Sequence, residues 1–207
     1  RSSDLVENGI VDIFQTVLEE SFHLSYPFVF KNRNQWWMLV ECAERKQLRF
    51  YRANSFPMDW GLAHVSFEGE AVYDPTLCEK DSLYWLFVNK KAHPGASSFD
   101  ELYLYFSDDL MTDSWNSHPM NPIVSDVKSS RPAGKLFQKH GQWFRPAQDS
   151  AKHYGHRIRI QKIIKWDREI YEEETHRILE PDWESGWEGT HTYNFTDQWL
   201  VMDTFKR

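Results

Sequence analysis

The sequence predicts an all-β protein of the β-propeller class, and three observations support this class. Tyr26-Pro27, Asp74-Pro75 and Arg131-Pro132 each open a segment of paired, strand-like runs. Their prolines are 48 and 57 residues apart, and about fifty residues is the length of one four-stranded blade. Helical periodicity is weak along the whole chain. Because a propeller gathers the same corner of every blade around one axis, we expect Tyr26, Asp74 and Arg131 to meet there.

The first two units begin near residues 23 and 73 and have the pattern of meanders of short strands. Aromatic and β-branched residues fill the runs, and Asn, Asp and Lys residues lie between them. In the first unit we predict a turn at 31–34 and strands at 28–30, 36–40 and 48–52. In the second unit, a run opening at residue 77 is followed by a turn at 79–82 and strands at 83–88 and 101–106.

Two further units begin near residues 130 and 189 and repeat this order. The third has a turn at 139–141 and predicted strands at 135–137, 143–144, 157–163 and 170–172. Residues 163–174 also carry a weak helical pattern, but a strand, a turn and a second strand fit the repeat better. The fourth unit stops after two strands, at 190–193 and 199–202, which are joined by a turn at 196–197. Residues 10–14 look like the last strand of a blade whose earlier strands are missing.

Length and composition fit one domain over residues 1–207, or a few blades of a larger one, and argue against two classes of partner. The chain has 24 Lys and Arg against 31 Asp and Glu without a concentrated basic cluster, so we expect no nucleic-acid partner. It has no run of eighteen apolar residues and no basic-then-apolar leader, so we expect no membrane span and, by default, a cytoplasmic location. Cys42 and Cys78 have no metal or redox spacing, which indicates buried hydrophobes; a disulfide between them stays open.

Several short motifs, taken together and in order, resemble those of a known family. They are His23-Leu24-Ser25-Tyr26-Pro27, Phe56-Pro57-x-x-Trp60, Tyr73-Asp74-Pro75-Thr76, His118-Pro119-x-Asn121-Pro122, Arg131-Pro132-Ala133-Gly134, Arg145-Pro146-Ala147-Gln148-Asp149, Tyr154-Gly155 and Gly189-Thr190-His191-Thr192. From about residue 10 to the end, the chain resembles the N-terminal domain of plant glucosamine inositolphosphorylceramide transferases and its bacterial relatives. Some of those relatives are joined to a formyltransferase domain.

This resemblance implies a five-bladed propeller similar to the arabinanase, levansucrase and invertase propellers, here incomplete and lacking most of its first blade. In the related glycosidases the first blade brings an Asp that serves as general base, and no matching Asp-Pro blade precedes residue 20. The chain is then a fragment, one part of a larger protein, or a family member that has lost a blade. A fused transferase or formyltransferase domain is an implied partner.

Asp74 is the candidate catalytic residue. By resemblance it matches the carboxylate that orients and tunes the acid in the related glycosidases, whereas its residue type fits a turn before proline equally well. Where those enzymes place an acidic Glu, this chain has Arg131, which removes the expected general acid. A guanidinium offers a planar fork for phosphate or carboxylate, so Arg131 and Arg145, each held in extended geometry before proline, predict an anion clamp.

The remaining candidates are polar residues expected at the same axis. Gln148 and Asp149 follow Arg145 and could bind sugar hydroxyls, or Asp149 could simply neutralise an arginine. Four more predicted substrate-binding residues lie at or near strand starts: His23, Tyr26, His156 and His191. Their spacing is too varied for a metal site, and we predict neither a metal nor another cofactor.

Two functions follow from these residues. The first is a carbohydrate-binding domain that positions a glycosyl substrate with an anionic group, such as a sugar phosphate, for a fused or partner transferase. The second is a glycoside hydrolase or glycosyl-transferring enzyme of the arabinanase-like superfamily. The missing general acid favours the carbohydrate-binding domain, and the polar cluster keeps the enzyme open. The sequence does not determine the sugar, its linkage or the oligomeric state.

Overall fold

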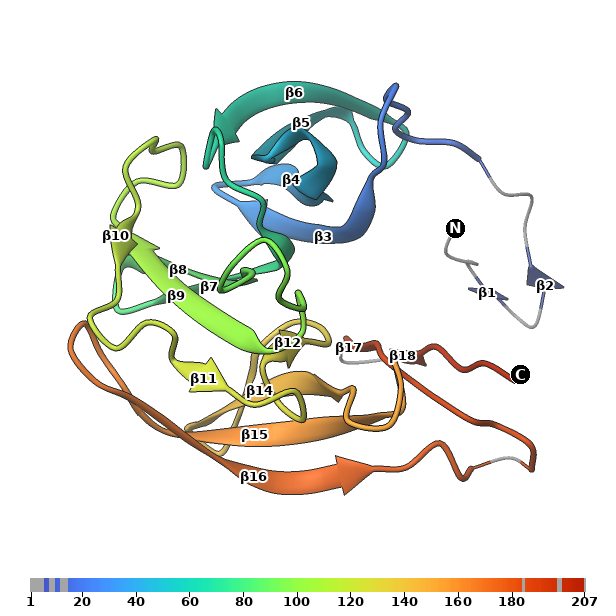
Figure 1. Ribbon diagram of the computed structural model, residues 1–207. Helices are drawn as coiled ribbons and strands as arrows, with labels where there is room; N and C mark the ends of the chain where they lie inside the picture. The colour runs from blue at the N-terminus through green and yellow to red at the C-terminus, as the bar shows by residue number, and fades with distance from the viewer. Residues whose placement is uncertain (1–5, 8–9, 12–14, 184, 197–198, 207) are drawn as a thin grey trace.

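The structure is a computed structural model that describes residues 6–7, 10–11, 15–183, 185–196 and 199–206. In these ranges nearly all regular structure is antiparallel β, and the one helical element is a 3-10 turn at Ala43–Arg45. Three large sheets lie around a common centre with the edge of each turned toward it (Figure 1). The all-β prediction is therefore confirmed. None of the described residues form a helix long and apolar enough to cross a membrane.

The first sheet has the strand order β3-β4-β5-β6, as expected for a meander. Its strands are β3 (Ser25–Asn32), β4 (Gln35–Cys42), β5 (Gln47–Ser55) and β6 (Asp59–Ser66). The second sheet has the order β7-β8-β9-β10, and β11 also pairs with β9. Its strands are β7 (Tyr73–Lys80), β8 (Leu83–Asn89), β9 (Glu101–Ser107), β10 (Asn116–Ser117) and β11 (Val124–Ser125).

The third sheet has the order β12-β14-β15-β16, with β13 also on β14. Its strands are β12 (Arg131–Pro132), β13 (Phe137–Lys139), β14 (Gln142–Asp149), β15 (Arg157–Trp166) and β16 (Tyr171–Leu179). Residues 163–174 thus form a strand, a turn and a second strand, as the repeat predicted. Two hairpins complete the described structure: β17 (Tyr193–Phe195) with β18 (Leu200–Met202), and β1 (Val6–Glu7) with β2 (Ile10–Val11). Of the strand predicted at 10–14, residues 12–14 lie outside the described residues.

The same tight turn recurs at the equivalent place in all three sheets. The two-residue loops Arg33-Asn34, Asp81-Ser82 and His140-Gly141 each have positive φ at both positions. Two left-handed residues define the type I′ turn, whose twist matches that of the strands it joins. The same hairpin type therefore occurs once in each of the three sheets.

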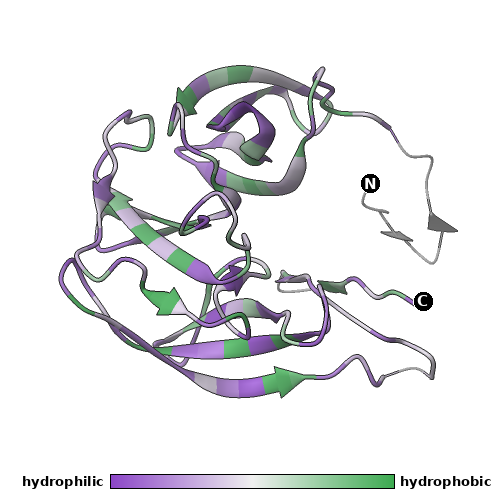
Figure 2. Ribbon diagram, in the orientation of Figure 1, coloured by the Kyte–Doolittle hydropathy of each residue, from purple (hydrophilic) through white to green (hydrophobic). Residues whose placement is uncertain are grey.

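Apolar side chains from neighbouring sheets form the core. One cluster joins the first sheet to the second through Phe28, Leu39, Phe50, Leu77, Leu86 and Tyr105. Another joins the second sheet to the third through Trp85, Phe87, Leu104, Ile163, Trp166 and Tyr171. Hydrophobic and hydrophilic residues alternate along β9, as a strand with two different faces requires (Figure 2). Cys42 and Cys78 are free and buried, so these two do not form a disulfide.

The β17–β18 hairpin docks on the third sheet through backbone contacts that leave no space for side chains. The Tyr193 amide donates to the Ala133 carbonyl (2.7 Å) and the Thr190 amide donates to the Gly155 carbonyl (2.8 Å). A Cβ atom on Gly189 would overlap the ring of Phe205 and the Gly155 carbonyl. Glycine at position 189 therefore lets the fourth unit approach the loop that follows β14.

Candidate functional site

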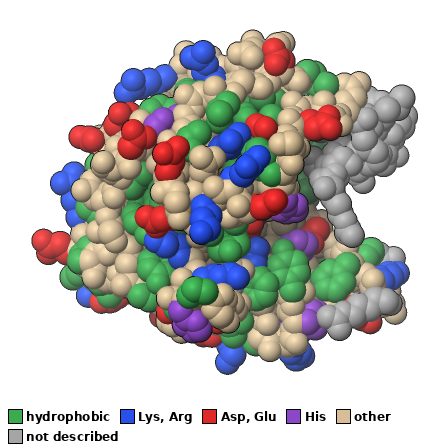
Figure 3. Space-filling model, turned by 45° about the horizontal axis from the view of Figure 1, so that its top comes forward, with side chains coloured by type: hydrophobic (Ala, Val, Ile, Leu, Met, Phe, Trp, Pro, Cys, Tyr) green, Lys and Arg blue, Asp and Glu red, His purple; other side chains and the backbone are tan. Residues whose placement is uncertain are grey.

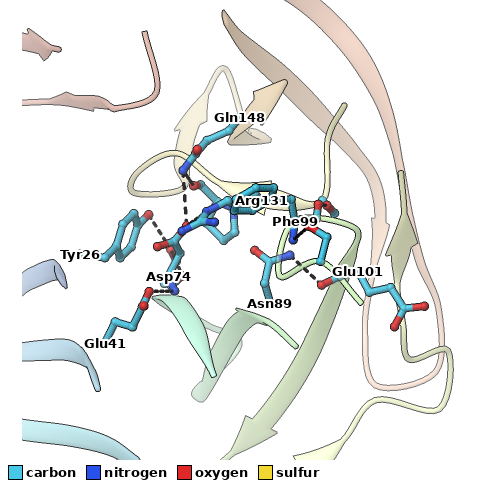
Figure 4. Close-up of polar contacts among 12 residues, drawn as sticks. Tyr26, Glu41, Asp74, Asn89, Phe99, Glu101, Arg131 and Gln148 are labelled. Atoms are coloured by element: carbon cyan, nitrogen blue, oxygen red, sulfur yellow. Dashed lines mark hydrogen bonds and ion pairs between the residues drawn. The ribbon is translucent and has the colours of Figure 1, made fainter. Parts of the chain in front are cut away.

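Side chains from the three sheets meet at Asp74 (Figure 4), where Arg131 and Gln148 bind its carboxylate and Tyr26 reaches Asp74 through Thr76. Asp74 on β7 is only 3 % exposed and forms an ion pair with the Nε of Arg131 on β12. The Nε2 of Gln148, on β14, donates to the same carboxylate at 3.4 Å and to the Pro132 carbonyl at 2.8 Å. Tyr26 on β3 shares a 3.0 Å hydrogen bond with the Thr76 hydroxyl, which donates to the Asp74 carbonyl at 3.3 Å. We call Tyr26, Asp74, Arg131 and Gln148 the Asp74 cluster.

Two members of this cluster occupy strained backbone positions of the same kind. Tyr26 has a φ of 47° and Asp74 a φ of 46°, although each precedes a proline. A residue before proline normally adopts an extended conformation, and a non-glycine residue in the left-handed region is strained. Both residues lie in a β-bulge that interrupts pairing with the second strand of the sheet. Because a bulge redirects a side chain, it turns Tyr26 and Asp74 toward the centre rather than along their sheets.

Arg131 packs against two neighbouring aromatic rings, Phe99 and Tyr154, whose centroids are 5.6 Å apart. Its guanidinium carbon lies 4.5 Å from the ring centroid of Phe99 and 5.2 Å from that of Tyr154. These two cation–π contacts help to orient the guanidinium and reinforce the ion pair. In the described part of the chain, the terminal guanidinium nitrogens of Arg131 form no hydrogen bond, whereas Nε is taken by Asp74. Arg131 therefore keeps a donor fork that a ligand could use.

Glu41, on β4, is a site residue that the sequence reasoning missed. Its carboxylate accepts a 2.9 Å hydrogen bond from the backbone amide of Asp74, and the residue is 7 % exposed. Burial and the neighbouring Asp74 carboxylate raise the pKa of Glu41 to about 7. The sequence does contain a signal for Glu41, which is a charged residue near the end of the otherwise apolar run 36–42. A carboxylate that is buried with such a run needs a partner.

Replacing Glu41 with glutamine should remove a pH dependence of stability. Because the folded-state pKa is raised above the ordinary 4.5, the stabilising contribution of the protonated carboxyl is fully present below about pH 4.5 and is lost as the pH rises through about 7. Urea unfolding of wild type between about pH 4.5 and 8 should therefore show a loss on the order of 1–3 kcal/mol that Glu41→Gln lacks. Glu79→Gln, at an exposed position on β7, is the matched control. Parallel pH curves for wild type and Glu41→Gln would contradict this assignment.

Arg145 and Asp149 do not make direct contacts with the Asp74 cluster. Arg145 is fully buried, and its guanidinium binds both oxygens of Glu173 (2.6 and 3.0 Å) and the Ser129 carbonyl (2.6 Å). Asp149 is also fully buried and accepts 2.9 Å hydrogen bonds from Arg157 and Arg159. Although burial opposes ionisation, these guanidinium groups lower the pKa of Asp149. The predicted clamp of two arginines is thus corrected to a single available guanidinium, Arg131, because Glu173 already neutralises Arg145.

The three histidines fall in different places. His191 forms an ion pair with Asp203, and its ring packs 5.1 Å from Tyr154, which links it to Arg131. His156 is buried at the edge of a separate pocket. His23 is exposed, and its backbone amide donates to the Glu44 carboxylate at 3.1 Å. In the described part of the chain its ring has no hydrogen bond to the Asp74 cluster, so the expectation that His23 faces the same centre stays a prediction.

The chemistry available at the cluster is hydrogen bonding and proton exchange. Glu41 offers a carboxyl that titrates near neutrality, and Arg131 offers charged donors. The side-chain Oε1 of Gln148 is a buried acceptor without a hydrogen-bond partner in the described part of the chain. No group of three His, Cys, Asp or Glu side chains in that part is arranged to hold a metal ion. The face in Figure 3 carries interspersed acidic and basic side chains rather than one basic patch.

Comparison with known proteins identifies sequence relatives over most of the chain. The family model for the N-terminal region of glucosamine inositolphosphorylceramide transferase 1 matches residues 6–205. The transferase of that name from Oryza sativa subsp. japonica is 38 % identical over 158 residues, which are 75 % of this chain and 21 % of that protein. The Arabidopsis thaliana protein is 33 % identical over 193 residues, 91 % of this chain and 25 % of its own length. The chain thus spans a quarter or less of these relatives.

Solved structures with a similar fold are glycoside hydrolases. The arabinanase Arb43A of Bacillus subtilis has a TM-score of 0.57 at 16 % identity, over 86 % of this chain and 64 % of that one. The beta-fructofuranosidase of Schwanniomyces occidentalis has a TM-score of 0.60 at 11 % identity, over 85 % and 37 % of the two chains. At such low identity the likeness shows the fold alone, which is that of the β-propeller glycoside hydrolases.

Proposed function

Because the chain belongs to the family of glucosamine inositolphosphorylceramide transferase N-terminal domains, we propose that it is a carbohydrate-binding propeller domain that positions a glycosyl substrate for a fused or partner transferase. The observation that carries this proposal is the Asp74 cluster. Strands of three sheets deliver a carboxylate, a guanidinium, an amide and a phenol to one point, two of them through strained bulges. Strain of this kind is retained where a side chain must be held in one orientation.

The unpaired groups of the cluster match the donors and acceptors of a sugar. The Gln148 Oε1 acceptor would be satisfied by a sugar hydroxyl, and a buried acceptor left without one is costly. The terminal nitrogens of Arg131 would bind an anionic substituent such as a phosphate, for which a guanidinium fork is suited. The preferred ligand is therefore a glycosyl group with a negative charge, and a sugar phosphate is the simplest example.

An enzyme is the second candidate, and Glu41 is the observation that favours it. A carboxyl with a pKa of about 7 is suited to exchange a proton with a leaving group. Hydrolysis of a glycoside, however, generally needs two carboxyl groups on opposite sides of the bond, about 5 to 9.5 Å apart. Glu41 is bound to the backbone amide of Asp74 itself, so both carboxyl groups lie together. This proximity favours binding over hydrolysis. In this proposal catalysis would be carried out by a fused or partner transferase.

Arg131→Lys should weaken binding of sugar phosphates and leave binding of neutral sugars nearly unchanged. Lysine keeps the positive charge beside Asp74 but lacks the fork, and a charge-assisted contact is worth roughly 1.5–3 kcal/mol, about a 10- to 150-fold change in affinity. Titration calorimetry of both proteins with hexose phosphates and with the parent hexoses measures this difference. Lys135→Arg, at an exposed position, is the control. Equal affinities of wild type and Arg131→Lys for every phosphate would remove the anion-binding role.

The enzyme candidate is tested separately with chromogenic arabinosides and galactosides. We expect no turnover by wild type above the level of a Glu41→Gln and Asp74→Asn double variant. Turnover that disappears in Glu41→Gln while sugar binding is retained would instead make this domain catalytic.

A further inference from the structure

A pocket of about 250 Å³ lies between the first and second sheets, at the strand ends that are remote from the Asp74 cluster. Tyr26 is near the start of β3, whereas Asn32, the last residue of that strand, lines the pocket. In the second sheet Asp74 is near the start of β7, whereas Tyr84 pairs with Glu79 near the other end of β7 and lines the pocket. The length of the strands therefore separates the two places.

The alternation of side chains along β4 and β5 explains which groups reach this pocket. On β4, three side chains share the face toward the second sheet: Glu41 lies at the Asp74 cluster, Leu39 in the core between the sheets, and Trp37 in the pocket. On β5, Arg52 is the register partner of Trp37 and shares a face with the core residue Phe50. The apolar core thus ends in a pocket to which a half-buried indole and a guanidinium both belong.

Two arginines supply positive charge to the pocket. Arg52 projects from β5, and Arg33 lies in the type I′ turn between β3 and β4. Within the described part of the chain neither guanidinium forms a hydrogen bond or an ion pair, and the indole N–H of Trp37 has no hydrogen-bond partner either. These groups are all donors, and guanidinium forks in particular suit a carboxylate.

Two aspartates from the second sheet line the same pocket. Asp108 and Asp109 follow β9, and the Met111 amide fixes Asp109 by donating to its Oδ1 at 3.0 Å. Among the residues that the structure describes, neither carboxylate forms an ion pair with Arg33 or Arg52. Opposite charges therefore line one pocket without neutralising each other, which suits a ligand that carries both charges.

Apolar and aromatic side chains complete the lining. Leu110 and Tyr84 are buried, and both belong to the pocket together with Trp37. The Tyr84 hydroxyl accepts a 2.8 Å hydrogen bond from the side-chain amide of Asn32, so its own proton is available to a ligand. Such a lining favours a ligand with an apolar or aromatic portion next to its charges.

We propose that this pocket binds a free α-amino acid with an aromatic or long apolar side chain. The two guanidinium groups bind the α-carboxylate, the two aspartates bind the α-ammonium, and Trp37 packs against the side chain. The pocket is smaller than the roughly 300–1,000 Å³ of sites for drug-sized ligands, which fits a ligand as small as one amino acid. None of these residues belongs to the Asp74 cluster, so the proposal is independent of the carbohydrate-binding function.

Titration calorimetry of the full chain with phenylalanine, phenylpropionate and phenylethylamine tests the pocket, because these ligands share a ring and differ in charge. Wild type should bind phenylalanine at least about tenfold more tightly than either analogue, since each analogue leaves one pair of charged groups without a partner. Arg52→Gln should weaken binding of phenylalanine and phenylpropionate about tenfold and should not weaken binding of phenylethylamine. At least one of Asp108→Asn and Asp109→Asn should weaken binding of phenylalanine and phenylethylamine but not of phenylpropionate.

Arg177→Gln, at an exposed position on β16, is the matched control and should change none of these affinities. Thermal unfolding verifies that each variant is folded. Equal affinity of wild type for phenylalanine and phenylpropionate, or unchanged phenylalanine binding in a double variant of Arg33→Gln and Arg52→Gln, would overturn the proposal. So would the absence of binding to phenylalanine, tryptophan, leucine and methionine alike. None of these results bears on the Asp74 cluster, which is tested with sugar phosphates.

Discussion

Replacing Arg145 with methionine is expected to lower the free energy of unfolding by about 3–5 kcal/mol. Arg145 has no exposed surface, and its removal would leave the Glu173 carboxylate, 8 % exposed, without its cation. Tyr171 would still donate to Glu173 at 2.6 Å, but a hydroxyl cannot neutralise a buried charge. Urea unfolding at neutral pH, monitored by circular dichroism, measures the change.

Arg159→Met is the matched control for this prediction. Arg159 also forms an ion pair from the third sheet, but its partner Asp149 keeps Arg157, so a loss of less than about 2 kcal/mol is expected. A double variant, Arg145→Met with Glu173→Gln, should recover part of the stability because no charge is left buried. A cost below about 1 kcal/mol for Arg145→Met would mean that Glu173 is solvated or protonated in the folded protein.

Replacing Arg131 with methionine should also lower the free energy of unfolding by about 3–5 kcal/mol, because it leaves the buried Asp74 carboxylate without its cation. The side chain of Asp74 is only 4 % exposed, and without Arg131 only the Gln148 amide, at 3.4 Å, would face its carboxylate. The contacts with Phe99 and Tyr154 would be lost as well. Adding Asp74→Asn to Arg131→Met should restore stability, and the double-mutant cycle gives the coupling energy of the pair. Additive single effects would refute a direct Asp74–Arg131 interaction.

The strand pattern and the centre of the site were predictable from the sequence because both depend on local chemistry. Type I′ turns need particular residues at two adjacent positions, and aromatic and β-branched runs favour strands, so turns were correctly predicted near residues 33, 81 and 140. The proline-marked positions also indicated that Tyr26, Asp74 and Arg131 share one place. Contacts through Thr76 and the Asp74 carboxylate bring them together.

The alternation of side chains along a strand separates the predicted binding residues of β14. Successive side chains of a strand point to opposite faces, so Gln148 and the pair Arg145 and Asp149 belong on different faces of β14. In the structure Gln148 contacts Asp74, whereas Arg145 and Asp149 bind groups of β15 and β16. Being close in sequence on the same strand was therefore not evidence of a shared site.

Sequence by itself determined the repeat, the strands and the polar character of the centre, since turn type, alternation and residue type act over a few residues. Only the tertiary structure decided which charged side chains form ion pairs with each other. Arg131 and Arg145 both precede a proline in the third sheet. Arg131 nevertheless pairs with Asp74, which is 57 residues earlier, and Arg145 pairs with Glu173, which is 28 residues later. Glu41 became a site residue through a contact with Asp74 across 33 residues. Such pairs form because a buried charge must be neutralised by whatever group the packing of neighbouring sheets brings within hydrogen-bond distance, and that group has no fixed spacing in the chain.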